Sequence, residues 1–99
     1  MWIDPASPDV LWMAGDVDLP VVRAGGHALT PDELNGVDVV DLTAVTFIDS
    51  SVVSLLANLV LRRPRSGEPL TVRNPPELAV VILEISGLSS SVRLVDQEN

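Results

Sequence analysis

The residues best suited to chemistry form one short run, Asp49-Ser50-Ser51, which directly precedes an apolar helical pattern. The N-terminus of a helix exposes unpaired backbone N–H groups and the positive end of the helix dipole, so it suits Asp or Ser side chains and bound phosphate. Two interpretations follow. In the first, Asp49 and Ser50 only cap the helix. In the second, a serine here accepts a phosphate. The phosphate would add about −1.5 to −2 charge and cause a partner bound around the serine to dissociate.

Other kinds of chemical site find little support in the residues. His27 is the only histidine and cysteine is absent, so the sequence predicts neither a metal site nor a thiol nucleophile. Asp16 and Asp18 could be a pair of acid–base carboxylates, but a solvated turn or a contact with a partner is the favoured interpretation. No nucleophile stands beside a base, and glycine-rich phosphate loops are absent. We therefore predict no catalytic residue, no metal, no cofactor and no enzymatic activity.

The composition sets the class of protein and its partners. The 99 residues fit one domain, residues 1–99, and the hydrophobic fraction of 46% can fill a core. The formal net charge of −8 argues against nucleic acid and against anionic lipid surfaces. The apolar run at residues 55–61 is far below the ~20 residues that span a bilayer, and residues 1–5 do not resemble a secretory signal. A cytoplasmic protein without direct membrane insertion is expected.

The elements that position the serine pair can be read from hydrophobic spacing. Short apolar runs predict strands at residues 2–3, 10–14, 37–42, 69–73 and 92–95, with residues 44–48 as a loop or a further extended piece. Residues 15–18 are expected to break the second strand. Alternating strands and helices predict an α/β fold: a single mixed, mostly parallel four- to five-stranded sheet with helices packed on it.

The helix after the serine pair is predicted over residues 52–62, because residue 63 precedes a proline. At about 100° per residue, one side of this helix faces the core. That side carries Val52, Val53, Leu56, Leu59 and Val60. The opposite side carries Ser51, Ser54, Asn58 and Arg62, with Leu55 at the border. The polar side therefore continues the surface that begins at Ser50.

Two further helical segments are expected. Between residues 19 and 36, Pro20 and the glycine pair 25–26 predict only a short helix or an irregular connection, followed by a helix start at Thr30. Near the C-terminus, Asn74 is the predicted cap of a last helix and Pro75 its first residue. Residues Leu78, Val81, Ile82 and Ile85 have the spacing of a buried stripe, and Gly87 is placed to end the helix.

Three segments, in order along the chain, resemble the signature of STAS domains, the family of the bacterial anti-sigma factor antagonists. Residues 39–51 (Val-Val-Asp-Leu-Thr-Ala-Val-Thr-Phe-Ile-Asp-Ser-Ser) are similar to the family's Asp-Leu-Ser and Phe-Ile-Asp-Ser-Ser-Gly-Leu pattern. Residues 15–18 resemble its Gly-Glu-Leu-Asp. Residues 74–88 resemble its Asn-Pro-Pro and Leu-Glu-Leu-Thr-Gly-Leu segments. Together these matches imply a STAS-like fold and a role in transcription regulation.

The resemblance also implies a mechanism. An unphosphorylated antagonist binds an anti-sigma factor and releases the sigma factor that it held. The anti-sigma factor, a serine kinase, then phosphorylates the first serine of Asp-Ser-Ser, and a separate phosphatase resets the protein. Carried onto this sequence, the acceptor is Ser50, with Ser51 as the second candidate. The implied partner-binding residues are Asp16, Asp18, Asp49, Ser50, Ser51, Ser54, Leu55 and Asn58.

Other roles stay open on the same resemblance. STAS domains also serve as constitutive scaffold or accessory subunits of lipid-transport ATP-binding cassette complexes and of signalling assemblies, without phosphorylation. A small-ligand carrier with a crevice at the strand ends is a third possibility. Val52 stands where the family has Gly, and its β-branched side chain is expected to narrow a partner's approach to the helix start, which favours the scaffold role.

Overall fold

The structure is a computed structural model that describes residues 1–64 and 67–96, apart from the side chains of residues 19 and 25–28. In chain order the elements are β1 (Trp2–Ile3), β2 (Val10–Val17), α1 (Leu19–Ala28), α2 (Pro31–Asn35), β3 (Val39–Ile48), α3 (Ser50–Leu61), β4 (Leu70–Arg73), α4 (Glu77–Ser86), the 3-10 turn η1 (Leu88–Ser91) and β5 (Val92–Val95). The strands form one sheet in the order β1-β2-β3-β4-β5. The predicted α/β fold with a mixed, mostly parallel sheet is confirmed.

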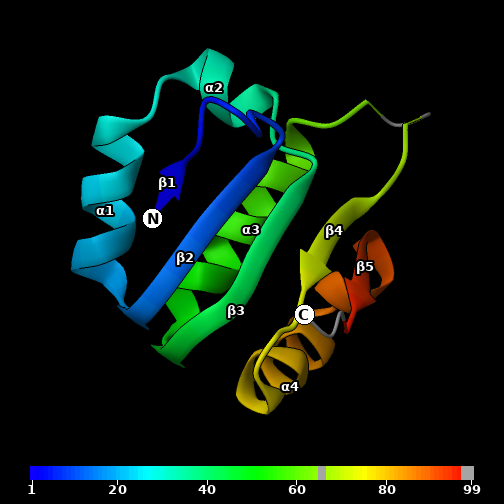
Figure 1. Ribbon diagram of the computed structural model, residues 1–99. Helices are drawn as coiled ribbons and strands as arrows, with labels where there is room; N and C mark the ends of the chain where they lie inside the picture. The colour runs from blue at the N-terminus through cyan, green and yellow to red at the C-terminus, as the bar shows by residue number, and fades with distance from the viewer. Residues whose placement is uncertain (65–66, 97–99) are drawn as a thin grey trace.

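The directions of the strands determine which strand ends lie together. β1 pairs with β2 antiparallel, whereas β2, β3, β4 and β5 are all parallel. The carboxyl ends of these four strands therefore meet at one edge of the sheet. Helix α3 leaves β3 at that edge and runs back behind β2 and β3, with α1 beside it and α4 below β4 (Figure 1).

The core lies between the sheet and the helices and is built almost wholly of aliphatic side chains. Its most deeply buried members are Leu11, Met13, Val17, Val37, Val40, Leu42, Val52, Leu56, Leu59, Leu70, Val72 and Leu83. Burying each of these side chains contributes about 1.5–3 kcal/mol relative to leaving it in water. Helix α3 supplies three of them on one face, so its orientation about its own axis is fixed by packing.

Strand β2 is longer than predicted. Residues 15–17, which were expected to break the strand, continue it to Val17. The strand can continue through this point because residue 15 is a glycine: Gly15 adopts φ +69°, in the left-handed region that side chains with a Cβ rarely enter. The pairing with β3 shifts register on both sides of this point, so the irregularity is absorbed within the sheet.

Helix α1 is also longer than predicted, because it continues through the glycine pair at 25–26 to residue 28. Two features support it. Asp18 caps its first turn, accepting a hydrogen bond from the Val21 amide at 3.3 Å. Val21 and Val22 pack against the core. Tertiary packing thus overrides the low helix propensity of glycine. The start of α2 at Thr30 is confirmed, with a complete capping box formed between Thr30 and Glu33.

The start of α4 differs from the prediction by two residues. Pro76, not Asn74, occupies the cap position, and the helix begins at Glu77. Asn74 instead adopts φ +51°, and its side-chain nitrogen Nδ2 donates to the Thr43 hydroxyl at 2.7 Å. This turn redirects the chain between β4 and α4. The predicted end of the helix at Gly87 is confirmed, with φ +80°.

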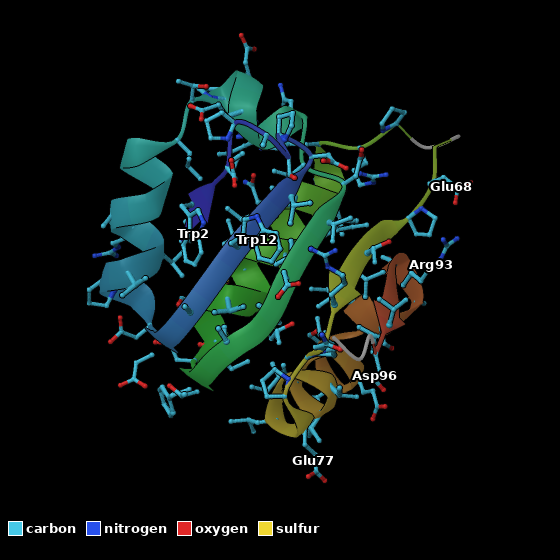
Figure 2. The ribbon with its side chains drawn as sticks, in the orientation of Figure 1. Trp2, Trp12, Glu68, Glu77, Arg93 and Asp96 are labelled. Atoms are coloured by element: carbon cyan, nitrogen blue, oxygen red, sulfur yellow. The ribbon has the colours of Figure 1, made fainter. Side chains whose placement is uncertain are left out.

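The sheet face opposite α3 carries a row of large side chains in cross-strand register. Trp2, Trp12, Asp41 and Arg73 occupy paired positions on four adjacent strands. Figure 2 shows the two indoles next to each other on the face turned toward the viewer. The Asp41 carboxylate lies 2.9 Å from Arg73 Nε, and the Arg73 guanidinium carbon lies 5.1 Å from the centre of the Trp12 ring. These contacts explain how Asp41 is buried.

Candidate functional site

The site forms where β2 and β3 end side by side. Asp16 pairs with Phe47 and Val17 with Ile48 in the parallel register. One residue further along, the Asp49 amide donates to the Val17 carbonyl at 3.3 Å. The acidic segment after β2 and the serine pair after β3, which are distant in sequence, are therefore adjacent in space.

Asp49 caps helix α3. One oxygen of its carboxylate accepts a hydrogen bond from the Ser51 amide at 2.8 Å and another from the Ser51 hydroxyl. Asp49 and Ser51 are both half-buried. The Ser51 hydroxyl is therefore committed to the cap, and a kinase would first have to break that contact.

Ser50 is placed differently from its neighbour. It is the first residue of α3 and is exposed. Among the residues and side chains that the structure describes, its hydroxyl makes no hydrogen bond to another residue. Of the two serines, Ser50 is thus the one that a docking protein can reach without local rearrangement.

The two carboxylates after β2 have separate surroundings. Asp16 is exposed and accepts a hydrogen bond from the Thr46 hydroxyl at 3.0 Å. Asp18 is half-buried and caps α1. Within the described part of the chain, neither forms an ion pair with arginine. Together with Asp49 they give this edge of the sheet a concentration of negative charge.

The remaining predicted contact residues lie along α3. Ser54 and Asn58 are exposed and follow Ser50 at intervals of one helical turn, so the three share one face. Asn58 lies about 12 Å along the axis from Ser50, and its side-chain oxygen accepts from Arg62 Nε at 2.7 Å. Leu55 is half-buried and packs against the core, so it contributes only part of its side chain to the surface.

The expected obstruction at Val52 is not present. The Val52 side chain is only 1% exposed and belongs to the core. It points into the protein beneath the helix start rather than toward the surface around Ser50. The prediction that Val52 narrows a partner's approach was therefore wrong, and the preference for a scaffold role that rested on it no longer applies.

Phe47 is a surface residue at this site that was not predicted from the sequence. Its side chain is 52% exposed, although it lies within a strand. Asp16 pairs with Phe47 while Gly15 pairs with Val45, so Thr46 is an extra residue in β3. Such a bulge turns Thr46 and Phe47 outward together. Phe47 thus places an apolar ring beside Asp16 and just before Asp49. The sequence signal that could have drawn attention to this residue is that Phe47 is the only phenylalanine in the chain.

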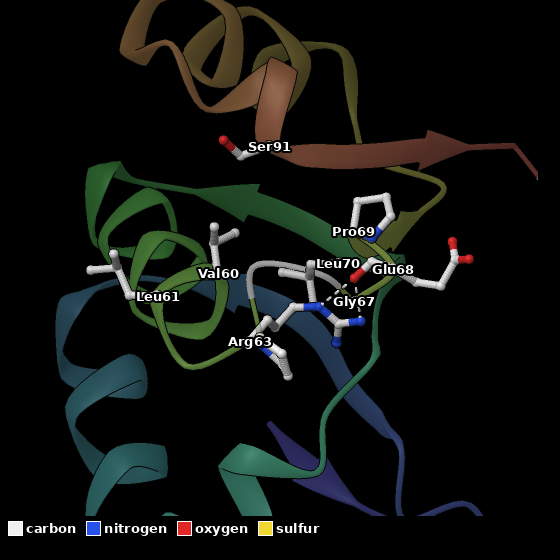
Figure 3. A pocket seen from close by; sticks show the side chains of 9 residues that line it. Val60, Leu61, Arg63, Gly67, Glu68, Pro69, Leu70 and Ser91 are labelled. Atoms are coloured by element: carbon white, nitrogen blue, oxygen red, sulfur yellow. Dashed lines mark hydrogen bonds between the residues drawn. The ribbon is translucent and has the colours of Figure 1, made fainter.

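A cavity of about 460 Å³ lies at the other end of α3 (Figure 3). Val60 and Leu61 of the last helical turn line it, together with Leu70 of β4 and Ser91 of η1. Arg63 closes one side, with Nε and Nη2 donating to the Glu68 carbonyl at 2.9 and 2.6 Å. This cavity is not the crevice at the carboxyl ends of the strands that a ligand carrier near Ser50 would need.

Comparison with known families assigns the fold that these features indicate. A family model described as "Mlab, STAS domain" matches residues 5–96. The chain belongs to the STAS domain family. A search of curated proteins gave no match. STAS domains often mediate contacts between proteins, which fits the exposed surface around Ser50. Across the described residues, no helix of this STAS domain is both long and apolar enough to cross a membrane.

Proposed function

We propose that this STAS domain is an anti-sigma factor antagonist that binds a serine-kinase anti-sigma factor and is switched off by phosphorylation of Ser50. The observation that carries the proposal is the division between the two serines. Ser50 is exposed with its hydroxyl uncommitted among the described residues, whereas the Ser51 hydroxyl donates to Asp49. An acceptor must present its hydroxyl to another protein's active site, and Ser50 meets this requirement.

The chemistry belongs to the kinase, and the domain itself is proposed to have no enzymatic activity. The Ser50 oxygen forms the new bond to the γ-phosphorus of ATP, and the bond from that phosphorus to the bridging oxygen of ADP breaks. The hydroxyl proton passes to a base of the kinase. The domain contributes the position of the hydroxyl, which the Asp49 cap and the buried face of α3 hold at the helix start.

Phosphorylation would then act at the contact itself, through the size of the charged phosphate and the cost of desolvating it. A phosphoserine adds about −1.5 to −2 charge to a surface that already holds Asp16, Asp18 and Asp49. A partner surface fitted to a small neutral hydroxyl would have to accommodate this group and desolvate it. The complex would therefore dissociate, and a phosphatase that removes the phosphate would restore binding.

The proposal is tested by binding assays with the anti-sigma kinases of the cell from which the gene comes. Ser50→Asp should weaken binding at least about tenfold, or about 1.4 kcal/mol, whereas Ser50→Ala should bind about as well as the wild type. Ser90→Asp, at an exposed position in η1, introduces the same charge away from the site and should leave the affinity unchanged. If no such kinase binds the unmodified protein, the proposal fails.

A constitutive scaffold role is the second candidate. The cap formed by Asp49 and Ser51 accounts for these polar residues by helix stability alone, without any phosphate. On this account the polar face of α3 binds a permanent partner, such as an ATP-binding cassette protein. Ser50→Asp would then leave the affinity for that partner unaltered, which separates the two candidates in the same assay.

A further inference from the structure

Helix α4 has an unusual composition for its position. Its sequence, ELAVVILEIS, contains seven apolar residues out of ten. A helix that is apolar on all sides is normally enclosed by protein. Helix α4 instead lies at the periphery of the molecule, with one side against the sheet and α3 (Figure 1).

Three of its large side chains face outward. Leu78 is 51% exposed, Val81 42% and Ile85 81%. Their spacing of three and four residues brings them onto one face, and we call this surface the α4 stripe. The core contacts of the helix come instead from Ala79 and Leu83, about 100° and 140° around the axis from Leu78.

Helical spacing in the sequence predicted that Leu78, Val81 and Ile85 belong to a buried stripe, and that prediction was wrong. Nearly every position of α4 is apolar, so the helical period could not distinguish the inner face from the outer one. In the structure, the inner face of α4 is the one that carries Ala79 and Leu83, which pack in the core. Leu78, Val81 and Ile85 are left exposed, where they are available for a contact with another molecule.

The charges on α4 indicate what that molecule is. Glu77 and Glu84 lie next to the α4 stripe on the helix surface, and α4 carries no basic residue. Figure 2 shows the Glu77 side chain projecting outward from the first turn. A second copy would bring the same two carboxylates and a net charge of −8 to the contact. An anionic lipid surface would be repelled for the same reason.

We infer that the α4 stripe docks an amphipathic helix of a partner protein, whose apolar face is flanked by Lys or Arg. Leu78, Val81 and Ile85 form a ridge along α4 that can pack against the apolar face of another helix. Glu77 and Glu84 then meet the basic flank, which selects the partner and fixes its direction. This interface does not involve the Ser50 hydroxyl, so it stands or falls independently of the phosphorylation switch.

The test uses a synthetic peptide of leucine and lysine, arranged as an amphipathic helix, and a scrambled peptide of the same composition. Binding to the full chain is followed by NMR chemical shifts and calorimetry. The amphipathic peptide should bind, with the largest shifts at the α4 stripe. Leu78→Ser/Val81→Ser/Ile85→Ser should weaken it at least about tenfold. Leu61→Ser removes an apolar side chain that is 85% exposed at the far end of α3, beside the cavity and outside the α4 stripe; it is the matched control and should bind as the wild type does.

A charge variant keeps the test decisive if the triple variant does not fold. Glu77→Lys/Glu84→Lys leaves every apolar side chain in place and should weaken the amphipathic peptide several-fold. Equal binding of the scrambled peptide, or unchanged affinity of the charge variant, would overturn the inference. So would sedimentation showing a dimer of the wild type that the triple variant loses, because the occupant would then be a second copy.

Discussion

At the scale of single residues, the serine pair shows how a helix cap can select one hydroxyl. Asp49 accepts hydrogen bonds from both the amide and the hydroxyl of Ser51, whereas the Ser50 hydroxyl, at the first helical position, has no hydrogen-bond partner among the described residues. The same carboxylate thus stabilises the helix and distinguishes the two serines. The chemistry of the residues alone does not reveal this distinction, because either serine hydroxyl could bond to Asp49.

Removing the cap should be measurable as a loss of stability. Asp49→Ala should lower the free energy of unfolding by about 1 kcal/mol, because a helix N-terminal amide loses its partner. Urea unfolding followed by tryptophan fluorescence measures the change. Asp9→Ala removes an exposed carboxylate and is the control for charge. An equal loss in both variants would mean that the cap contributes nothing beyond charge.

The buried pair of Asp41 and Arg73 makes a larger prediction. Asp41→Ala should cost about 3 kcal/mol, the lower end of the range for a broken buried pair, because the Arg73 side chain is 20% exposed. The double variant Asp41→Leu/Arg73→Met should cost less than the single one, since no charge is then left without a partner. Urea unfolding measures these free energies, and a double variant that loses as much stability as Asp41→Ala or more would contradict this account of the pair.

At the scale of elements, the sequence predicted the type and order of the helices and strands better than their boundaries and their buried faces. The five strands, helix α3, the cap of α2 and the end of α4 could be read from spacing and from cap residues. The bulges in β3 could not, because a β-bulge depends on the neighbouring strand; Phe47 was missed for this reason. Asn74 looked like a cap, but its φ of +51° comes from the turn between β4 and α4.

Gly15 gives a prediction at this scale. Gly15→Ala should destabilise the protein by about 1–2 kcal/mol, because a Cβ atom disfavours its φ of +69°. The penalty would be conformational, since no described atom beyond Gly15 and its two chain neighbours lies within 4 Å of the added Cβ. Gly36→Ala, at a right-handed position with ordinary contacts, should be close to neutral. Thermal unfolding of the two variants makes the comparison, and equal losses would reject the conformational explanation.

At the scale of the whole molecule, charge governs how a partner approaches. The net charge is −8, and Asp16, Asp18 and Asp49 concentrate part of it at the edge of the sheet where Ser50 lies. The composition alone argued against nucleic acid and anionic lipid as partners, but only the fold brings these three residues together. Long-range attraction of this kind raises association rates and is screened by salt.

The association rate with the proposed kinase should therefore fall about tenfold between about 20 mM and about 300 mM salt, with little change in the dissociation rate. Stopped-flow mixing measures both rates. Asp16→Asn/Asp18→Asn keeps a capping side chain at residue 18 and should flatten the salt dependence. Asp9→Asn/Asp32→Asn changes the net charge by the same amount, away from the carboxyl ends of the strands. This variant should retain the salt dependence. Identical slopes for the two variants would exclude steering by this surface.

The central claim, that Ser50 is the hydroxyl presented to a kinase, is tested most directly by mapping the phosphate. The chain is incubated with an anti-sigma kinase that binds it and with ATP, and is then analysed by intact mass and by fragmentation of the peptide that contains residues 49–51. One phosphate should be found on Ser50, still present in Ser51→Ala and absent in Ser50→Ala. A phosphate on Ser51, or none on a protein that the kinase binds, would contradict the claim.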